Sequence, residues 1–241
     1  MDHVSCSIHA GETLGLVGES GCGKTTLAKL LVRLLSPSEG EVFVRGAPFG
    51  VLRGPALLAA RRAVQFVFQD PTNSLNPRMT VEETLSEPFI IHRITRGEER
   101  RTRVRELLET VQLPVSYGPR LPRELSGGER QRVGVARALA TDPEVLICDE
   151  PIASLDVSVG AQIVALLRDL VRRRRMALLF ISHDLRAVAS LCEYLAVMRA
   201  GRLVELGPTE HLLNHPRDPY TELLIRSAEL DLESSGSDLD L

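Results

Sequence analysis

A short glycine-rich segment near the start of the chain sets the strictest limit on how it can fold. Residues 18–25 read Gly-Glu-Ser-Gly-Cys-Gly-Lys-Thr, between the apolar run Thr13–Val17 and a stretch over 25–35 with leucines at helical spacing. The glycines let the backbone curl so that its N–H groups converge, and a helix start adds positive potential. Strand, loop and helix in this order predict a phosphate-binding P-loop.

The side chains of this loop suit a nucleotide with bound magnesium. Lys24 can reach the outer phosphates, and the Thr25 hydroxyl can ligate Mg²⁺. A chance match to the pattern arises roughly once in a hundred chains of this length. We therefore expect nine consecutive residues to hold the phosphates: Gly18, Glu19, Ser20, Gly21, Cys22, Gly23, Lys24, Thr25 and Thr26.

A second anchor for the metal is expected at the end of another strand. The apolar run 145–148 ends in Asp149 and Glu150. We expect Asp149 to hold the Mg²⁺ shell and Glu150 to polarise an attacking water. Alone, such a run is as often a plain strand-to-loop boundary, but its pairing with the P-loop favours the metal site.

Apolar runs and helical patterns alternate along the chain, as a mostly parallel α/β sheet requires. Further strands are expected at 41–45, 63–68, 144–148, 177–181, 194–198 and 202–206, and helices at 81–91 and 98–112. We predict an α/β fold with a RecA-like P-loop NTPase core over 1–69 and 141–213 and a small N-terminal antiparallel β portion. A helical subdomain is inserted over 70–140, and a C-terminal tail covers 214–241, disordered from about residue 229.

Composition excludes several classes of function. The 29 basic and 32 acidic residues give a net charge of −3, which argues against a protein that binds nucleic acid through its overall charge. No apolar run approaches the ~18 residues that cross a bilayer, and the start lacks a signal-peptide pattern. The four cysteines are scattered without metal spacing, so reduced thiols in a cytosolic protein are the simplest interpretation.

A second motif indicates a narrower class of protein than the P-loop alone does: residues 125–132 read Leu-Ser-Gly-Gly-Glu-Arg-Gln-Arg. A serine cap before two glycines forms a second anion site at a helix start, yet one nucleotide needs only one phosphate cradle. The segment resembles the signature motif of ATP-binding-cassette (ABC) ATPases. The resemblance implies that Ser126, Gly127 and Gly128 close over ATP held by the P-loop of a second cassette.

Three other family motifs stand in the expected order. Gln69 resembles the Q-loop glutamine, Asp156 the D-loop aspartate at the dimer interface, and His183 the switch histidine that contacts the γ-phosphate. The resemblance implies ATP and Mg²⁺ as cofactors and ATP hydrolysis as the reaction. It implies metal binding by Thr25, Gln69 and Asp149, and catalysis by Glu150, His183 and Gln69.

Within the family, the chain is most similar to the dipeptide/oligopeptide/nickel importers. This similarity rests on segments 68–71, 74–80 and 215–221. It implies a place at the cytoplasmic face of the cell membrane, two transmembrane permease subunits and an extracytoplasmic solute-binding protein. It also implies a non-identical second cassette in an ATP-sandwich dimer. Di- or oligopeptides are the first expectation for the cargo, and nickel or another small solute the second.

Two other functions stay open. A soluble ABC ATPase of DNA repair needs long coiled-coil arms between Gln69 and Ser126, and the ~55 residues there contain no sustained heptads. Translation factors carry two cassettes, whereas this chain has one set of motifs.

The second function that stays open is that of a non-hydrolysing regulatory nucleotide binder. The family stacks adenine on an upstream aromatic residue, and none precedes Phe43, so we expect a curtailed start. The complete set of catalytic positions favours hydrolysis.

Overall fold

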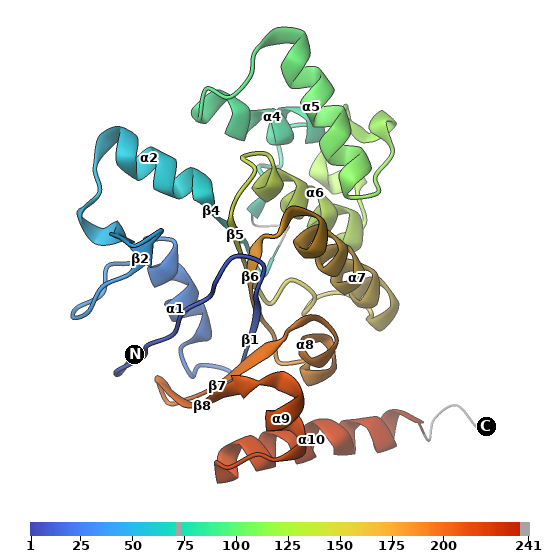
Figure 1. The fold of residues 1–241 in the computed structure, drawn as a ribbon. Coiled ribbons are helices and arrows are strands. Elements are labelled where there is room, and N and C mark those ends of the chain that lie inside the picture. The colour runs from blue at the N-terminus through green and yellow to red at the C-terminus, as the bar shows by residue number, and fades with distance from the viewer. Residues whose placement is uncertain (71–73, 237–241) are drawn as a thin grey trace.

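A six-stranded sheet forms the centre of the molecule in the computed structural model, which describes residues 1–70 and 74–236 (Figure 1). The strands lie in the order β4 (Val64–Val67), β5 (Val145–Asp149), β6 (Ala177–Ile181), β1 (Thr13–Val17), β7 (Tyr194–Arg199) and β8 (Arg202–Pro208). Neighbouring strands are parallel except at the β7–β8 pair. A separate antiparallel hairpin joins β2 (Phe43–Val44) to β3 (Ala47–Pro48). The predicted fold class is confirmed.

Helices cover both faces of the sheet. The α-helices in the described part of the chain are α1 (Lys24–Leu31), α2 (Gly54–Ala63), α4 (Val81–Ile91), α5 (Gly97–Thr110), α6 (Gly127–Leu139), α7 (Val157–Arg174), α8 (Leu185–Leu191), α9 (Thr209–Asn214) and α10 (Pro219–Gly236). Alternate strand residues face opposite ways. Ile147 therefore packs in one core with Leu27 of α1, whereas Leu146 packs in a second core with buried residues of α6, α7 and α8.

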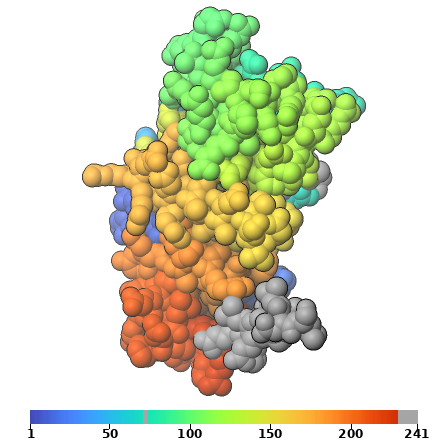
Figure 2. Space-filling view, turned by 90° about the vertical axis from the view of Figure 1, so that its right-hand side faces the viewer, coloured from blue at the N-terminus to red at the C-terminus, as the bar shows by residue number. Residues whose placement is uncertain are grey.

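The inserted helices form one end of the molecule. Helices α4, α5 and α6 bury Phe89, Leu108 and Val135 in a core continuous with one face of the sheet. Figures 1 and 2 show the α4–α5 region at one end and the C-terminal helices at the other. In the part of the chain that the structure describes, no helix is both long and apolar enough to cross a bilayer.

Some element boundaries differ from the sequence prediction. Helix α1 ends at Leu31, because Arg33 has a left-handed φ of 56° and the leucines beyond it are exposed. Of the strand expected at 41–45, only the two residues of β2, Phe43–Val44, are in a strand. Helix α10 extends to Gly236, past residue 229, from which the sequence predicts a disordered tail; that disorder stays a prediction. Residues 71–73 of the Gln69 segment and 237–241 of the tail lie outside the described residues.

Candidate active site

The predicted phosphate, metal and catalytic residues lie at one edge of the sheet. Gly18 follows β1, Gln69 follows β4, Asp149 ends β5 and His183 follows β6. The parallel register aligns the carboxyl ends of these strands. In open α/β sheets, ligands bind outside this edge. The sheet topology therefore assembles a site from four separate parts of the sequence.

The glycine loop passes close to the end of β7. Gly18 has a φ of 150°, and a Cβ on it would collide with the carbonyl oxygen of Met198. Gly23 has a φ of 111° at the N-cap of α1, a conformation that an L-residue rarely adopts. The N–H group of Gly201, in the β7–β8 turn, donates to the carbonyl of Cys22 at 2.9 Å. The loop shape thus depends on two glycines and on a neighbouring turn.

Lys24 lies inside this loop. Its side chain is buried, and its Nζ donates to the carbonyl oxygens of Gly18 at 2.7 Å and Glu19 at 3.0 Å. The Sγ of Cys22 lies 3.9 Å from the same nitrogen. An ammonium has three donors and no acceptor, so these carbonyls hold positions that phosphate oxygens can take over. The backbone of the glycine loop therefore surrounds the Lys24 ammonium.

Thr25 and Asp149 meet although 124 positions separate them in the sequence. The Thr25 hydroxyl donates to the Asp149 carboxylate at 3.2 Å, and Asp149 is only 3% exposed. Burial raises the pKa of Asp149, and the Thr25 hydrogen bond opposes that rise. Mg²⁺ prefers one or two protein oxygens together with phosphate and water. The Thr25 hydroxyl and the Asp149 carboxylate lie side by side and supply two such protein oxygens.

One carboxylate oxygen of Glu150 brings the three predicted catalytic side chains together. The Gln69 amide Nε2 donates to Glu150 Oε2 at 3.2 Å, and His183 Nδ1 lies 3.4 Å from the same oxygen. The Glu150 side chain is 17% exposed and its backbone φ is 45°, a left-handed conformation that is uncommon outside glycine. Such strained residues cluster at functional sites.

The signature residues cap a helix. Ser126 is the N-cap of α6: its Oγ accepts from the N–H of Glu129 at 3.3 Å, and the Glu129 carboxylate accepts from the Ser126 N–H at 2.7 Å. That backbone hydrogen bond lowers the pKa of Glu129 and outweighs the opposite effect of burial. Gly127 and Gly128 follow in the first turn. The helix start leaves backbone N–H groups for an anion.

Asp156 is the corresponding cap of α7. Its carboxylate accepts from the N–H of Val159 at 2.9 Å, and this hydrogen bond lowers its pKa. Within residues 1–70 and 74–236, no hydrogen bond joins Asp156 or residues 126–128 to the phosphate loop. The predicted site residues therefore form two groups in a single chain, one at the sheet edge and one at two helix starts.

Tyr220 also contacts the phosphate loop, although local sequence patterns do not predict this contact. Its hydroxyl accepts a hydrogen bond from the N–H of Glu19 at 2.9 Å, across 201 positions of sequence. Segment 215–221 served only as a mark of the importer subgroup. Nothing in the local pattern indicates which distant residue the tyrosine contacts.

Comparison with known proteins identifies the family of this arrangement. The ABC transporter family matches residues 1–153. The chain is 47% identical over 232 residues to the oligopeptide transport ATP-binding protein OppF of Bacillus subtilis (strain 168), covering 95% of this chain and 76% of that protein. It is 48% identical over 228 residues to the probable peptide ABC transporter ATP-binding protein y4tS of Sinorhizobium fredii, covering 95% of this chain and 65% of the relative.

Solved structures agree with the fold. The ATP-binding cassette MJ0796, in a dimeric post-hydrolysis state with ADP and Pi, matches with a TM-score of 0.77 and 31% identity, covering 85% of this chain and 88% of that one. The cbiO1 protein of Clostridium perfringens, part of the transporter complex cbiONQ, matches with a TM-score of 0.79 and 27% identity, covering 99% and 91%. The phosphate loop, the capped signature helix and these matches together show that the chain belongs to the ABC transporter family.

Proposed function

We propose that this chain is the ATP-hydrolysing subunit of an ABC importer for di- or oligopeptides. The observation that carries the proposal is the meeting, at one sheet edge, of the Lys24 loop, the Thr25–Asp149 pair and the Glu150 cluster. The peptide-transport names of the B. subtilis and S. fredii relatives support the cargo.

In this proposal, residues 18–26 hold the ATP phosphates. Lys24 exchanges the carbonyls of Gly18 and Glu19 for phosphate oxygens, which suit an ammonium better because they are charged. Thr25, Asp149 and Gln69 would hold Mg²⁺. When bound, the metal neutralises charge on the outer phosphates.

Glu150 is the proposed water-orienting group. Its carboxylate accepts from Gln69 and lies beside His183, so two neighbours fix its direction. A carboxylate in this place aligns a water for in-line attack on the γ-phosphate. His183, whose side chain is 64% exposed, reaches outward from the same point and supports the charge on the transferring group together with Lys24.

The second group of site residues requires a second cassette. The α6 start at Ser126–Gly128 and the D-loop at Asp156 contribute to ATP held by the opposite chain, and the dimeric state of the similar MJ0796 cassette supports this arrangement. We propose a non-identical cassette as the partner. Two permease subunits and an extracytoplasmic solute-binding protein complete the importer, with this chain at the cytoplasmic face of the membrane.

Replacing Glu150 by Gln tests the proposal. Assayed together with its partner cassette, the variant should bind ATP as the wild type does, release phosphate at least ~10²-fold more slowly, and accumulate in closed dimers, since binding remains while the general base is lost. Phosphate release and light scattering measure these effects. Glu144→Gln, just before the same strand β5, is the matched control and should keep wild-type turnover.

Wild-type turnover in Glu150→Gln would reject the assignment. Absence of phosphate release from the wild type, together with tight ATP binding, would instead favour the non-hydrolysing binder.

A further inference from the structure

The C-terminal part of the chain returns to the phosphate loop through one side chain. Tyr220, in the first turn of α10, is 3% exposed, and its hydroxyl oxygen accepts from the N–H of Glu19 at 2.9 Å. The guanidinium of Arg199, at the end of β7, lies 4.8 Å from the centre of the tyrosine ring. Burial raises the pKa of Tyr220, so the hydroxyl stays protonated at neutral pH.

Tyr220 and Lys24 hold opposite ends of one peptide group. The carbonyl of Gly18 and the N–H of Glu19 belong to the same peptide bond. Lys24 Nζ donates to that carbonyl at 2.7 Å, while the Tyr220 hydroxyl accepts from that N–H. A peptide group is planar, so the two contacts together fix its orientation. When Lys24 leaves the carbonyl for a phosphate, the hydrogen bond to Tyr220 remains in place.

The tyrosine is itself held by groups outside the phosphate site. The Glu205 carboxylate, on β8, accepts from the N–H groups of Arg217 at 3.0 Å and Asp218 at 3.2 Å. The Asp218 carboxylate accepts from the N–H of Tyr220 at 2.8 Å. These bonds fasten segment 217–220 to the sheet before any nucleotide arrives. The hydroxyl is therefore pre-organised, and binding need not order it.

We propose that Tyr220 is a positioning residue for the phosphate loop: it keeps the Gly18–Glu19 peptide in the nucleotide-binding orientation after Lys24 has turned to the phosphates. The role is separate from catalysis, because Tyr220 acts through a backbone N–H of the loop. The inference rests on the proposed function of residues 18–26 as the ATP phosphate site.

Tyr220→Phe in the full chain tests the inference, because it removes the hydroxyl and keeps the ring over Arg199. The affinity for fluorescent mant-ATP, measured near 10 °C on variants whose circular dichroism matches that of the wild type, should weaken about three- to tenfold, the effect of one lost buried hydrogen bond. In a turnover assay KM for ATP should rise by the same factor while kcat stays within about twofold of the wild type.

Two controls separate positioning from general loosening. Tyr194→Phe removes an exposed hydroxyl on β7 and should bind mant-ATP as the wild type does. Leu212→Ala empties a buried position in the neighbouring α9; it should lower Tm yet leave the affinity unchanged. Equal weakening in Leu212→Ala and Tyr220→Phe would overturn the inference.

The same experiment distinguishes this inference from the proposed function. If the wild type binds mant-ATP, Lys24→Ala loses binding and Tyr220→Phe matches the wild type, the positioning role is wrong and the phosphate site stands. If the wild type does not bind mant-ATP, both are wrong.

Discussion

At the scale of single residues, Glu129 organises the start of α6. Its carboxylate accepts from the N–H of Ser126 and from the hydroxyl of Tyr117 at 2.8 Å, and Arg120 lies 3.7 Å from the centre of the Tyr117 ring. The Ser126 oxygen accepts from the Glu129 N–H, which leaves the serine's own proton free to donate. The cap thus presents a hydroxyl donor where the signature helix begins, as an anion requires.

Glu129→Gln should reduce the pH dependence of folding stability in the acid range. The folded pKa of Glu129 lies below its ordinary 4.5, so the carboxylate's contribution is fully present above that value and is lost as pH falls through the folded pKa. Gln cannot titrate, so this pH-dependent part should be absent from the variant as the pH falls below about 5. Urea unfolding across this range measures it, with Glu106→Gln on α5 as control. Identical pH dependence in wild type and Glu129→Gln would contradict the role of this carboxylate.

At the scale of elements, the contact between α6 and α7 depends on a residue without a side chain. A Cβ on Gly128 would collide with Cγ1 of Val159, in the first turn of α7. Gly134, farther along α6, is different: a Cβ there would meet nothing within 4 Å. The two glycines therefore separate a packing requirement from helix propensity.

Gly128→Ala should destabilise the protein by about 1–3 kcal/mol through overpacking, lowering Tm by a few degrees for a domain of this size. Gly134→Ala should leave Tm unchanged or raise it, since Ala is the better helix former by roughly 0.5–1 kcal/mol. Val159→Ala in the Gly128→Ala background should recover part of the loss. Scanning calorimetry checks all three, and equal effects of the two glycine substitutions would rule out the collision.

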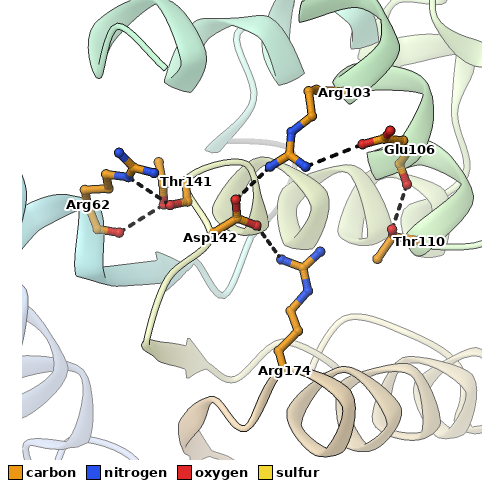
Figure 3. A network of polar contacts seen from close by, with 7 residues as sticks. All are labelled: Arg62, Arg103, Glu106, Thr110, Thr141, Asp142 and Arg174. Atoms are coloured by element: carbon orange, nitrogen blue, oxygen red, sulfur yellow. Dashed lines mark hydrogen bonds and ion pairs between the residues drawn. The ribbon is translucent and has the colours of Figure 1, made fainter. Parts of the chain in front are cut away.

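At the scale of the whole molecule, a polar network ties the inserted helices to the core (Figure 3). Asp142, in the connection between α6 and β5, accepts from Arg103 of α5 at 2.7 Å and from Arg174 of α7 at 3.0 Å. Beside it, Thr141 donates to the carbonyl of Arg62 at 3.0 Å, and its own carbonyl accepts from that arginine at 3.1 Å. Three separate parts of the chain thus meet at two consecutive residues.

Asp142→Asn should weaken this link without straining the backbone, because Asn tolerates the φ of 50° found here. Exposed ion pairs contribute about 0.2–1 kcal/mol each, and salt screens them. We therefore expect a small loss of stability that shrinks near 1 M salt, with faster hydrogen exchange in α5. Asp169→Asn, which breaks a pair within α7 alone, should leave α5 exchange unchanged. Unchanged α5 exchange in Asp142→Asn would remove the network's linking role.

Local patterns predicted much of this protein. The apolar run of β1, the glycine loop and the leucine-spaced α1 were expected in order, and the alternation of strands and helices indicated the parallel sheet. These features can be predicted because each depends only on residues close together in the sequence. The local signals are apolar periodicity, the conformational freedom of glycine and a capping serine. The roles assigned to the site residues stay predictions, although the sheet brings the Gln69, Glu150 and His183 side chains together.

The amino-acid sequence by itself therefore determined which segments become strands, loops and capped helices, since those choices are local. Tertiary structure alone decided which distant groups meet: the Lys24 ammonium on the loop's own carbonyls, the Tyr220 hydroxyl on the Glu19 N–H, and Arg103 and Arg174 on one carboxylate. The Tyr220 contact spans 201 positions, and no periodicity carries that information. Such contacts exist only once the sheet and its covering helices have packed, because packing fixes the distances at which these polar groups can bond.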